Sequence, residues 1–497
     1  MPYNDYKNHL QKIADIGFAS AVLSWDQETY MPPKGADFRA RQLSTLAGVS
    51  HKMYTEVEFG KILDSLKNNN SLTEKEAKNI SLTVEDYEKQ KKYSTEFVEK
   101  MSRAVSECFQ AWQTAKEKND FSIYAPHLEK LVDLKRQECE LLGYKDHPYN
   151  ALLDQYEKGI TTAEVEQLFE EVKKELVPFV KKIAAAQQVD DSFFYKHYDK
   201  NKQWELGIEL LKQMGYDFDA GRQDISSHPF TIHFNAQDVR VTTRINENDL
   251  SEMIWSCIHE GGHGLYEQGL PTEQYGLPLG ETISLGIHES QSRLWENNVG
   301  RSLNYWKKNF GLVQKYFPEQ LKGISAEDFY KGMNKVTPSL IRTSADELTY
   351  HFHVLIRFEI EKALIEGKVN VQDLPELWNS KYKDYLGITV PSNSKGVLQD
   401  IHWSHGSFGY FPTYSIGSFY AAQFFARAQK EIKELDNQIT EGQLLPLLNW
   451  LRDKIHQHGK MYTASELCEK ITGEKLNFKY FMDYAKIKYS IIYKLIE

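Results

Sequence analysis

Apolar and polar residues follow the period of an α-helix along most of this chain. Residues 5–24 form one amphipathic segment, and the same spacing covers residues 36 to about 190. The helical spacing resumes at Asn248 and characterises the final stretch, residues 418–497. The pattern predicts a mainly α-helical protein whose helices pack through their apolar faces.

Local signals indicate where several of these helices end and begin. Pro32 and Pro33 interrupt a helix, so residues 25–35 are predicted to form a loop between the first two helices. In a capping box, a Ser or Thr and an acidic residue three positions later bond each other's backbone N–H groups. Such boxes are predicted to begin at Ser71, Thr161, Ser325 and Thr463.

The period changes to two near the middle of the chain. Residues 227–234 and 238–245 alternate in polarity on either side of a turn at 235–237, which predicts a small antiparallel hairpin. No internal repeat, low-complexity segment or linker divides the chain, and 41% hydrophobic residues can fill a sizeable core. We therefore expect one domain over residues 1–497.

Composition and charge exclude several classes of protein. The formal charge of −10, with no basic run, argues against a nucleic-acid partner. No apolar run reaches the ~18 residues that a membrane span needs. The four cysteines lack C-x-x-C spacing, which excludes a thiolate zinc site, and the N-terminus lacks the features of a signal peptide. We expect a soluble cytoplasmic protein.

The segment with the clearest chemistry is His259-Glu260-Gly261-Gly262-His263. On a helix, two histidines four residues apart project only about 40° from each other, so both imidazoles can reach one metal ion. A catalytic zinc also needs a nearby carboxylate to accept a proton from water. Glu260 points away from the histidines by about 100° and is therefore the candidate general base, not a ligand.

The glycines of this segment argue against an ordinary surface helix. Gly261, Gly262 and Gly264 each destabilise a helix interior by about 1 kcal/mol relative to alanine. We expect them to permit close approach of a neighbouring helix or of a substrate.

A third ligand is expected downstream, because Tyr266 and Gly269 replace the Gly and His of a metzincin. Glu289 is favoured because it lies in a helical pattern with Arg293 one turn later; the alternative is a solvated glutamate paired with that arginine. Cys257 projects away from the histidines and is assigned to the core. The glutamates considered are Glu267, Glu273, Glu281, Glu289 and Glu296.

Further candidate residues occupy two later segments and the hairpin. A long helix is predicted from Ile341, and its Arg342 needs an anionic partner, either Asp346 or a substrate carboxylate. His402, Tyr410 and Tyr414 are candidate stabilisers of an oxyanion, or else members of an aromatic core. Arg240 of the hairpin either contacts a substrate or is solvated.

Taken together, these segments resemble the carboxypeptidase Taq family, metallocarboxypeptidases of the gluzincin group. The resemblance covers nearly the whole chain and consists of seven motifs in the family's order. They are Trp25-Asp26-Gln27 through Pro33, His228-Pro229-Phe230, Asp238-Val239-Arg240-Val241-Thr242, His259-Glu260-Gly261-Gly262-His263, His288-Glu289-Ser290-Gln291-Ser292-Arg293, Ile341-Arg342-Thr343 with Ala345-Asp346, and Gly396-x-x-Gln399-Asp400-x-His402-Trp403.

The resemblance implies a two-lobed helical peptidase with a deep cleft and a small sheet, usually a homodimer. It implies Zn²⁺, or Co²⁺, bound by His259, His263 and Glu289, with Glu260 as general base. Arg342 would bind the C-terminal carboxylate of the substrate. His228, Arg240 and Tyr410 would contact the peptide, and His402 and Tyr414 would line the cleft. Ser344 departs from the family, since an acidic residue is expected there.

The predicted function is therefore release of single amino acids from the C-terminus of peptides by metal-activated water attack, with broad specificity and poor cleavage next to proline. An endo-acting oligopeptidase would share the metal site but would also cleave C-terminally amidated peptides. A catalytically silent scaffold would bind peptides without turnover, and the intact metal motif argues against it.

Overall fold

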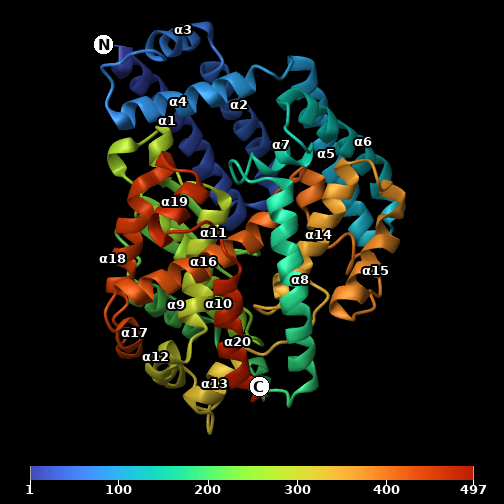
Figure 1. Ribbon diagram of the computed structural model, residues 1–497, viewed down its shortest axis with the longest axis vertical. Coiled ribbons are helices and arrows are strands. Elements are labelled where there is room, and N and C mark those ends of the chain that lie inside the picture. Colours follow the sequence, from blue (N-terminus) through green and yellow to red (C-terminus); the bar gives the residue numbers. More distant parts are fainter. Residues whose placement is uncertain (1, 496–497) are drawn as a thin grey trace. The chain divides into compact units, whose positions relative to one another are not determined.

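The computed structural model describes residues 2–495 and divides into two compact units (Figure 1). The first unit comprises the chain up to Lys91, Asp190–Met333 and Tyr420–Leu476. The second comprises Lys92–Val189, Asn334–Phe419 and the chain from Asn477. Each unit is thus assembled from three separate stretches of sequence. The expected single domain over residues 1–497 stays a prediction, and Met1, Ile496 and Glu497 lie outside the described residues.

The first unit contains a small sheet and most of the helices. Its elements are α1 (Pro2–Thr29), α2 (Ala36–Tyr54), α3 (Val57–Leu66), α4 (Glu74–Gln90), α9 (Lys200–Met214), β1 (Gly221–Ile225), β2 (Thr231–Asn235), β3 (Asp238–Thr243), α10 (Leu250–Glu267), α11 (Leu285–Arg293), α12 (Leu303–Tyr316), α13 (Ala326–Met333), α17 (Leu435–Glu441), α18 (Leu445–Lys454) and α19 (Ala464–Thr472).

The second unit contains helices joined by loops, and no strand occurs among its described residues. It contains α5 (Thr95–Lys118), α6 (Phe121–Leu142), α7 (Tyr149–Leu153), α8 (Thr162–Ala185), α14 (Tyr350–Ile365), α15 (Leu374–Leu386) and α20 (Lys479–Tyr493), and α16 (Phe411–Glu431) begins in it and ends in the first unit. The mainly α fold predicted from the helical period is therefore confirmed.

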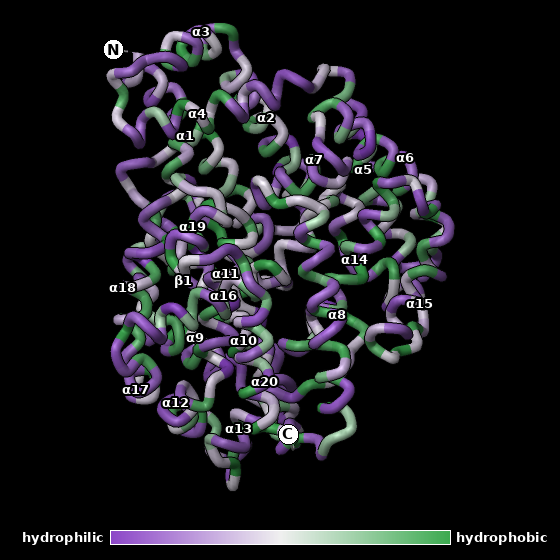
Figure 2. The backbone as a smooth tube through the Cα atoms, viewed as in Figure 1, coloured by the Kyte–Doolittle hydropathy of each residue, from purple (hydrophilic) through white to green (hydrophobic). Residues whose placement is uncertain are grey.

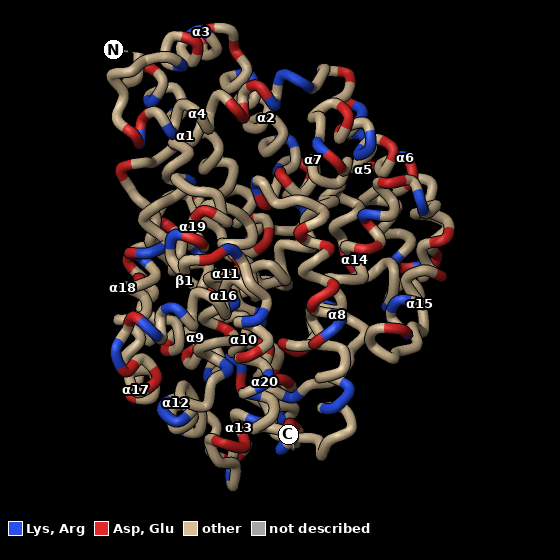
Figure 3. Tube along the Cα trace, viewed as in Figure 1, with Lys and Arg blue, Asp and Glu red and all other residues tan. Residues whose placement is uncertain are grey.

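Apolar and polar residues are interspersed along the helices of both units. Figure 2 shows hydrophobic and hydrophilic residues alternating along the tube, and Figure 3 shows acidic and basic residues intermixed. Among the described residues, no helix has the length and apolar character needed to cross a membrane.

The sheet has the strand order β1-β3-β2. Strands β2 and β3 are antiparallel, with Thr231 opposite Val241 and His233 opposite Val239, so the predicted hairpin is confirmed. Strand β1 pairs with β3 in parallel, and this mixed sheet was not predicted. Two successive residues of β1, Gln223 and Asp224, are buried but polar. A strand that buries polar side chains gives no apolar alternation to detect.

The predicted loop at residues 25–35 is partly wrong, because α1 continues to Thr29. Trp25 is therefore helical, and its side chain is only 7% exposed. The guanidinium groups of Arg222 and Arg240 lie 5.3 and 4.4 Å from its ring. Burial of this indole between the helix and the sheet stabilises the last turn of α1, and the chain leaves the helix only before Pro32.

Three of the four predicted helix starts are confirmed. Thr161 and Thr463 form capping boxes, and Ser325 exchanges hydrogen bonds with Asp328. The box predicted at Ser71 is wrong: α4 is capped two residues later by Thr73. The Ser71 hydroxyl instead donates to Asn69 within the preceding turn, 2.7 Å away.

The long helix predicted from Ile341 begins only at Tyr350, so that prediction is wrong. Arg342–Ser344 form a short 3-10 turn instead. The Asp346 carboxylate accepts hydrogen bonds from the N–H groups of Leu348 and Thr349 at 2.9 and 3.0 Å. An aspartate in this position stabilises a turn before the helix rather than a helix interior.

Candidate metal centre

Helix α10 presents both motif histidines on one side. Asp249 caps the helix by accepting a hydrogen bond from the N–H of Ser251 at 2.9 Å. The rings of His259 and His263 lie nearly perpendicular, with centroids 4.9 Å apart. Their Nε2 atoms face the neighbouring helix α11, which begins after Ser284 and carries Glu289.

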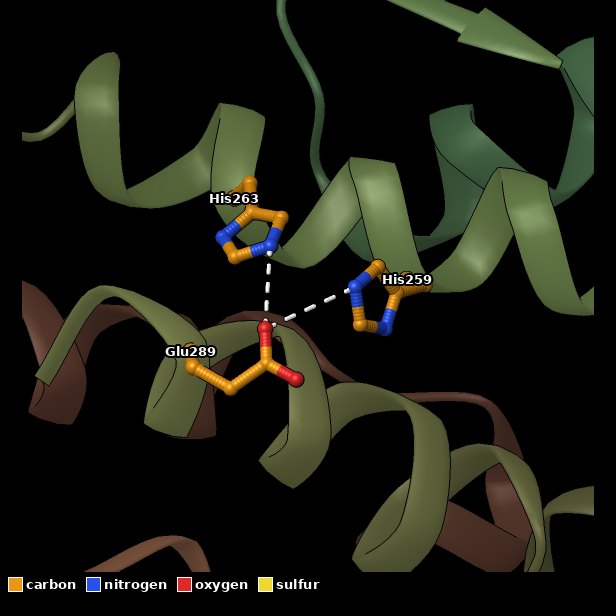
Figure 4. A group of neighbouring side chains, drawn as sticks. All are labelled: His259, His263 and Glu289. Carbon is orange, nitrogen blue, oxygen red and sulfur yellow. Dashed lines mark ion pairs between the residues drawn. The ribbon is translucent and has the colours of Figure 1, made fainter. Parts of the chain in front are cut away.

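Glu289 brings one oxygen between the two histidines (Figure 4). Its Oε2 lies 3.7 Å from Nε2 of His259 and 3.4 Å from Nε2 of His263. The three candidate ligand atoms all lie within 4.8 Å of one another. Ligands bound tetrahedrally at about 2.0–2.2 Å from zinc are themselves roughly 3.4 Å apart. The spacing of these atoms therefore suits one small divalent cation.

Gly262 sets the distance between the two ligand-bearing helices. A Cβ atom at this position would lie 2.7 Å from Cα of Ser292 and 2.8 Å from the carbonyl oxygen of Gln291. Both atoms belong to the α11 backbone, which cannot move aside as a flexible side chain could. At Gly262 the predicted close approach is thus an approach of α11, the helix that carries Glu289, whereas Gly261 and Gly264 face Leu211 and Tyr216.

Glu260 is buried on the side of α10 that faces the sheet. Its Oε2 accepts a 2.6 Å hydrogen bond from the hydroxyl of Thr231 on β2, and its side chain is 6% exposed. Burial raises the pKa of Glu260, while His259 and the Thr231 hydroxyl act in the opposite direction. The bond from Thr231 leaves Oε1 as the other oxygen available for proton transfer.

The ionisation states of the cluster suit a cation site. Burial and the neighbouring His288 lower the pKa of His263 to about 3, so this imidazole stays neutral and keeps a lone pair for a metal. Burial opposes ionisation of Glu289, but Arg293 and His259 outweigh it and hold its pKa well below its usual range. Glu289 and His263 are thus present in the forms that bind metal. Burial lowers the pKa of His259, but Glu289 and Glu296 outweigh it and raise that pKa, so a metal ion would have to displace any proton on this ring.

The charge balance around the cluster also favours a cation. Arg293 donates to Oε1 of Glu289 at 2.7 Å, which leaves Oε2 directed at the histidines. The buried carboxylates Glu289, Glu260 and Glu296 lie beside two guanidinium groups among the described residues, those of Arg293 and Arg301. Three carboxylates against two guanidinium groups leave one excess negative charge, which favours binding of a cation.

A second carboxylate supports the cluster from behind His263. The His288 ring stacks on His263 with centroids 4.3 Å apart. Glu267 lies 2.8 Å from Nε2 of His288 and 3.2 Å from Nδ1 of His233. Glu267 therefore fixes the ring against which His263 packs.

The remaining glutamates considered as third ligands have other partners. The partners of the glutamates are His288 for Glu267, Lys75 for Glu273, Lys460 for Glu281, and Nδ1 of His259 for Glu296.

Cys257 is buried, as predicted, with its sulfur 3.2 Å from the Gln223 side chain.

In the second unit, Arg342 pairs with Asp400 and not with Asp346. Its Nε and Nη2 donate to Oδ1 of Asp400 at 3.2 and 3.0 Å, and Nη1 donates to the Tyr350 hydroxyl at 3.1 Å. Arg357 contacts the other oxygen of Asp400 at 2.5 and 2.6 Å. Two buried guanidinium groups thus share one carboxylate, which leaves an excess positive charge.

The candidate aromatic residues lie near this arginine pair in the same unit. Nε2 of His402 is 3.2 Å from the Tyr414 hydroxyl, and the His402 and Tyr410 rings are 5.3 Å apart. Burial and Arg342 lower the pKa of His402 to about 3, so the ring is neutral. The guanidinium of Arg342 lies 4.8 Å from the Tyr414 ring. Ser344, in contrast, is exposed, and Asp400 supplies the negative charge.

The hairpin residues Arg240 and His228 have structural contacts in the first unit. Arg240 donates twice to Asp238 at 2.9 Å and covers Trp25. His228 is exposed, and its carbonyl accepts a hydrogen bond from Ser226 at 2.6 Å. Their predicted contacts with a peptide stay predictions.

Three residues of these clusters were not singled out from the sequence. Thr231 is one of several alternating strand residues, and Arg301 lies beyond the end of α11, so neither carries a local signal. Arg357 is different: it is a cation between the apolar residues Val354-Leu355-Ile356 and Phe358, and such a position indicates a buried charge pair.

The chain is similar to known proteins over nearly its whole length. A family model described as Carboxypeptidase Taq (M32) metallopeptidase matches residues 5–489. Carboxypeptidase 1 of Bacillus subtilis (strain 168) is 40% identical over 488 residues, covering 98% of this chain and 97% of the relative. Thermostable carboxypeptidase 1 of Thermus thermophilus is 38% identical over 509 residues, covering 99% of each.

A solved structure extends the similarity to the fold. The crystal structure of the M32 carboxypeptidase from Deinococcus radiodurans R1 matches with a TM-score of 0.98 and 38% identity. The match covers 99% of this chain and 100% of that one. The similarity in sequence and in fold therefore extends over nearly the full length of this chain. The chain belongs to the carboxypeptidase Taq family and is a metallocarboxypeptidase that requires a divalent metal.

Proposed function

We propose that this metallocarboxypeptidase releases single amino acids from the free C-terminus of peptides, with Zn²⁺ held by His259, His263 and Glu289. The observation that carries the proposal is the position of Glu289 Oε2, 3.7 and 3.4 Å from the two imidazole nitrogens. Two imidazole nitrogens and one carboxylate, with the fourth position left to water, form a donor set of zinc hydrolases. Co²⁺ is the alternative ion.

The bound metal would supply a Lewis acid that polarises the scissile carbonyl group and acidifies water. Glu260 accepts the proton of the attacking water at Oε1, because Oε2 is held by Thr231. It then returns the proton to the leaving amine. Burial raises its pKa, which brings the carboxyl closer to the range in which it can both accept and donate.

Arg342 is proposed to bind the C-terminal carboxylate of the substrate. Its contacts with Asp400 and Tyr350 use three of its five N–H donors, which leaves two for a carboxylate. The excess positive charge of Arg342 and Arg357 over Asp400 supports an anionic ligand. His402 and Tyr414 are proposed to stabilise the developing oxyanion, and Tyr410, Arg240 and His228 to contact the peptide.

The edge strand β2 is proposed to bind the peptide backbone. The carbonyl of Phe230 accepts a hydrogen bond from the N–H of Thr242 on β3. Hydrogen-bonded and non-hydrogen-bonded residues alternate along an antiparallel pair, so the backbone groups of Thr231 and His233 point away from β3. An extended peptide can pair with such groups, next to Glu260. Broad specificity, poor cleavage near proline, a homodimer and a cytoplasmic location stay predictions.

Mass spectrometry of a ten-residue peptide tests this proposal. The metal-loaded protein is incubated with the free acid and, in parallel, with the same peptide amidated at its C-terminus. We expect a ladder that loses one residue at a time from the free acid only. Internal cuts in both peptides would instead indicate an oligopeptidase, and Arg342 would then have another role.

A further inference from the structure

Glu296 is a buried carboxylate that contacts a proposed metal ligand without being a ligand itself. Its Oε2 lies 2.8 Å from Nδ1 of His259, while Nε2 of the same ring faces Glu289. Glu296 is 6% exposed, so water competes little for this contact. The His259 ring thus has a carboxylate beside each of its two nitrogens.

A π-helical turn brings Glu296 next to Arg301. Leu294–Gly300 continue α11 in this wider form, and the N–H of Arg301 donates to the Glu296 carbonyl at 2.8 Å. In an α-helix, side chains five residues apart would point about 140° from each other. The wider turn reduces this angle, and Nη2 of Arg301 donates to Oε1 of Glu296 at 3.1 Å.

A second arginine links Glu296 to the ligand Glu289. Arg293 donates from Nη1 to Oε2 of Glu296 at 3.0 Å and from Nε to Oε1 of Glu289 at 2.7 Å. Arg301 is itself fixed by a 2.7 Å hydrogen bond to the carbonyl of Met333. Rotation of Glu296 away from His259 would therefore break contacts with both guanidinium groups.

The contact with Glu296 has a direct chemical effect on His259. A carboxylate beside Nδ1 requires the proton on that nitrogen, so Nε2 presents its lone pair toward Glu289. The same interaction makes the imidazole a more basic ligand and restricts rotation of its ring.

His263 depends on a different support. Within the described residues its Nδ1 is buried without a hydrogen-bond partner, and its ring is held by stacking on His288. Loss of Glu296 should therefore affect one histidine and leave the other in place.

We propose that Glu296 is a positioning residue of the metal site: by binding Nδ1 of His259 it fixes the tautomer and orientation of that imidazole, and so sets the affinity for the divalent cation. The inference rests on the metal site of the proposed function.

Two variants of the full-length protein test it. Glu296→Gln keeps the side-chain length but removes the charge, so Arg301 and Arg293 each lose a carboxylate partner and folding can be impaired. Glu296→Asp keeps the charge for Arg293 and Arg301, but its carboxylate is one methylene too short for Nδ1 of His259. Unfolding of each metal-free variant in urea reports its stability separately from its metal affinity.

The measurements are the Zn²⁺ dissociation constant, by competition with a chromophoric chelator, and the visible absorption spectrum of the Co²⁺ form. We expect Glu296→Asp to weaken Zn²⁺ binding about 10–100-fold and to change the Co²⁺ spectrum. The control is Asp224→Asn, which removes another buried carboxylate paired with an arginine, Arg222, in the same unit. It should lower stability without changing either metal measurement.

Zn²⁺ affinity within about threefold of the wild-type value and an unchanged Co²⁺ spectrum in folded Glu296→Asp would overturn the role of Glu296. Wild-type protein that binds neither ion would instead overturn the metal site itself, and the inference with it. The two failures are therefore distinguishable.

Discussion

The hydroxyl of Thr231 donates a 2.6 Å hydrogen bond to Oε2 of Glu260, which connects strand β2 to the motif on α10. We expect Thr231→Val, which keeps the side-chain shape, to lower kcat about 10–100-fold, the cost of a hydrogen bond to a charged group. Zn²⁺ affinity should not change, because Thr231 contacts no proposed ligand. Steady-state kinetics with a short peptide tests this, with Thr231→Ser as a control that keeps the hydroxyl.

Glu260→Gln should abolish turnover while the metal stays bound. The amide cannot accept the proton of the attacking water, and loss of a general base lowers rates by about 10²–10⁴-fold. Metal content by atomic emission and kcat on the same sample provide the measurement. Turnover near the wild-type rate in the metal-loaded variant would remove Glu260 from its proposed role.

Gly262→Ala should disrupt the metal site through the backbone. The added methyl group would meet the α11 backbone at 2.7 Å, so α11 and Glu289 must move away from the histidines. We expect a large loss of Zn²⁺ affinity together with a lower melting temperature. Gly17→Ala is the matched control, because nothing lies within 4 Å of a Cβ atom at this helical position. It should stabilise α1 by roughly 0.5–1 kcal/mol and leave Zn²⁺ binding unchanged.

Arg342→Lys should raise KM for free-acid peptides by about 10–100-fold, since lysine cannot form the paired bonds of a guanidinium group with a carboxylate. The smaller effect should be on kcat. Arg357→Lys alters the fully buried partner on the same Asp400 and should lower stability with little change in KM. An equal rise in KM for both variants would contradict a specific role of Arg342 in substrate binding.

Glu361, buried in the second unit, should make stability depend on pH. Burial raises its pKa to about 7 from 4.5, although Tyr149, Gly409 and Trp403 donate hydrogen bonds to it. Because the folded-state pKa is the higher one, its contribution is favourable below pH 4.5 and is lost as the pH rises through about 7. The loss between pH 5 and 9 should be roughly 2–3 kcal/mol.

Urea unfolding of wild type and Glu361→Gln at several pH values measures this contribution. Glutamine at position 361 does not titrate, so any other effect of the substitution changes the free energy of unfolding by the same amount at every pH. The wild-type stability minus that of the variant should fall as the pH rises. A difference that stays constant from pH 5 to 9 would show that Glu361 does not titrate in this range.

The sequence alone predicted the elements whose signals are local. Helical periodicity gave the mainly α fold, alternation gave the hairpin, and two capping boxes were placed to the residue. The histidines of the motif could be paired because a spacing of four residues places them on one helix face. The seven motifs in order identified the family, which the full-length comparisons confirm.

Contacts between distant segments were decided only by the tertiary structure. Asp400, not Asp346, is the partner of Arg342, and β1 joins the sheet through polar residues. The contacts of Thr231 with Glu260 and of Glu296 with His259 join residues 29 and 37 positions apart. The physical reason is that a local pattern records which face of an element is buried, whereas a buried polar group takes whichever partner the packed chain brings within hydrogen-bonding distance.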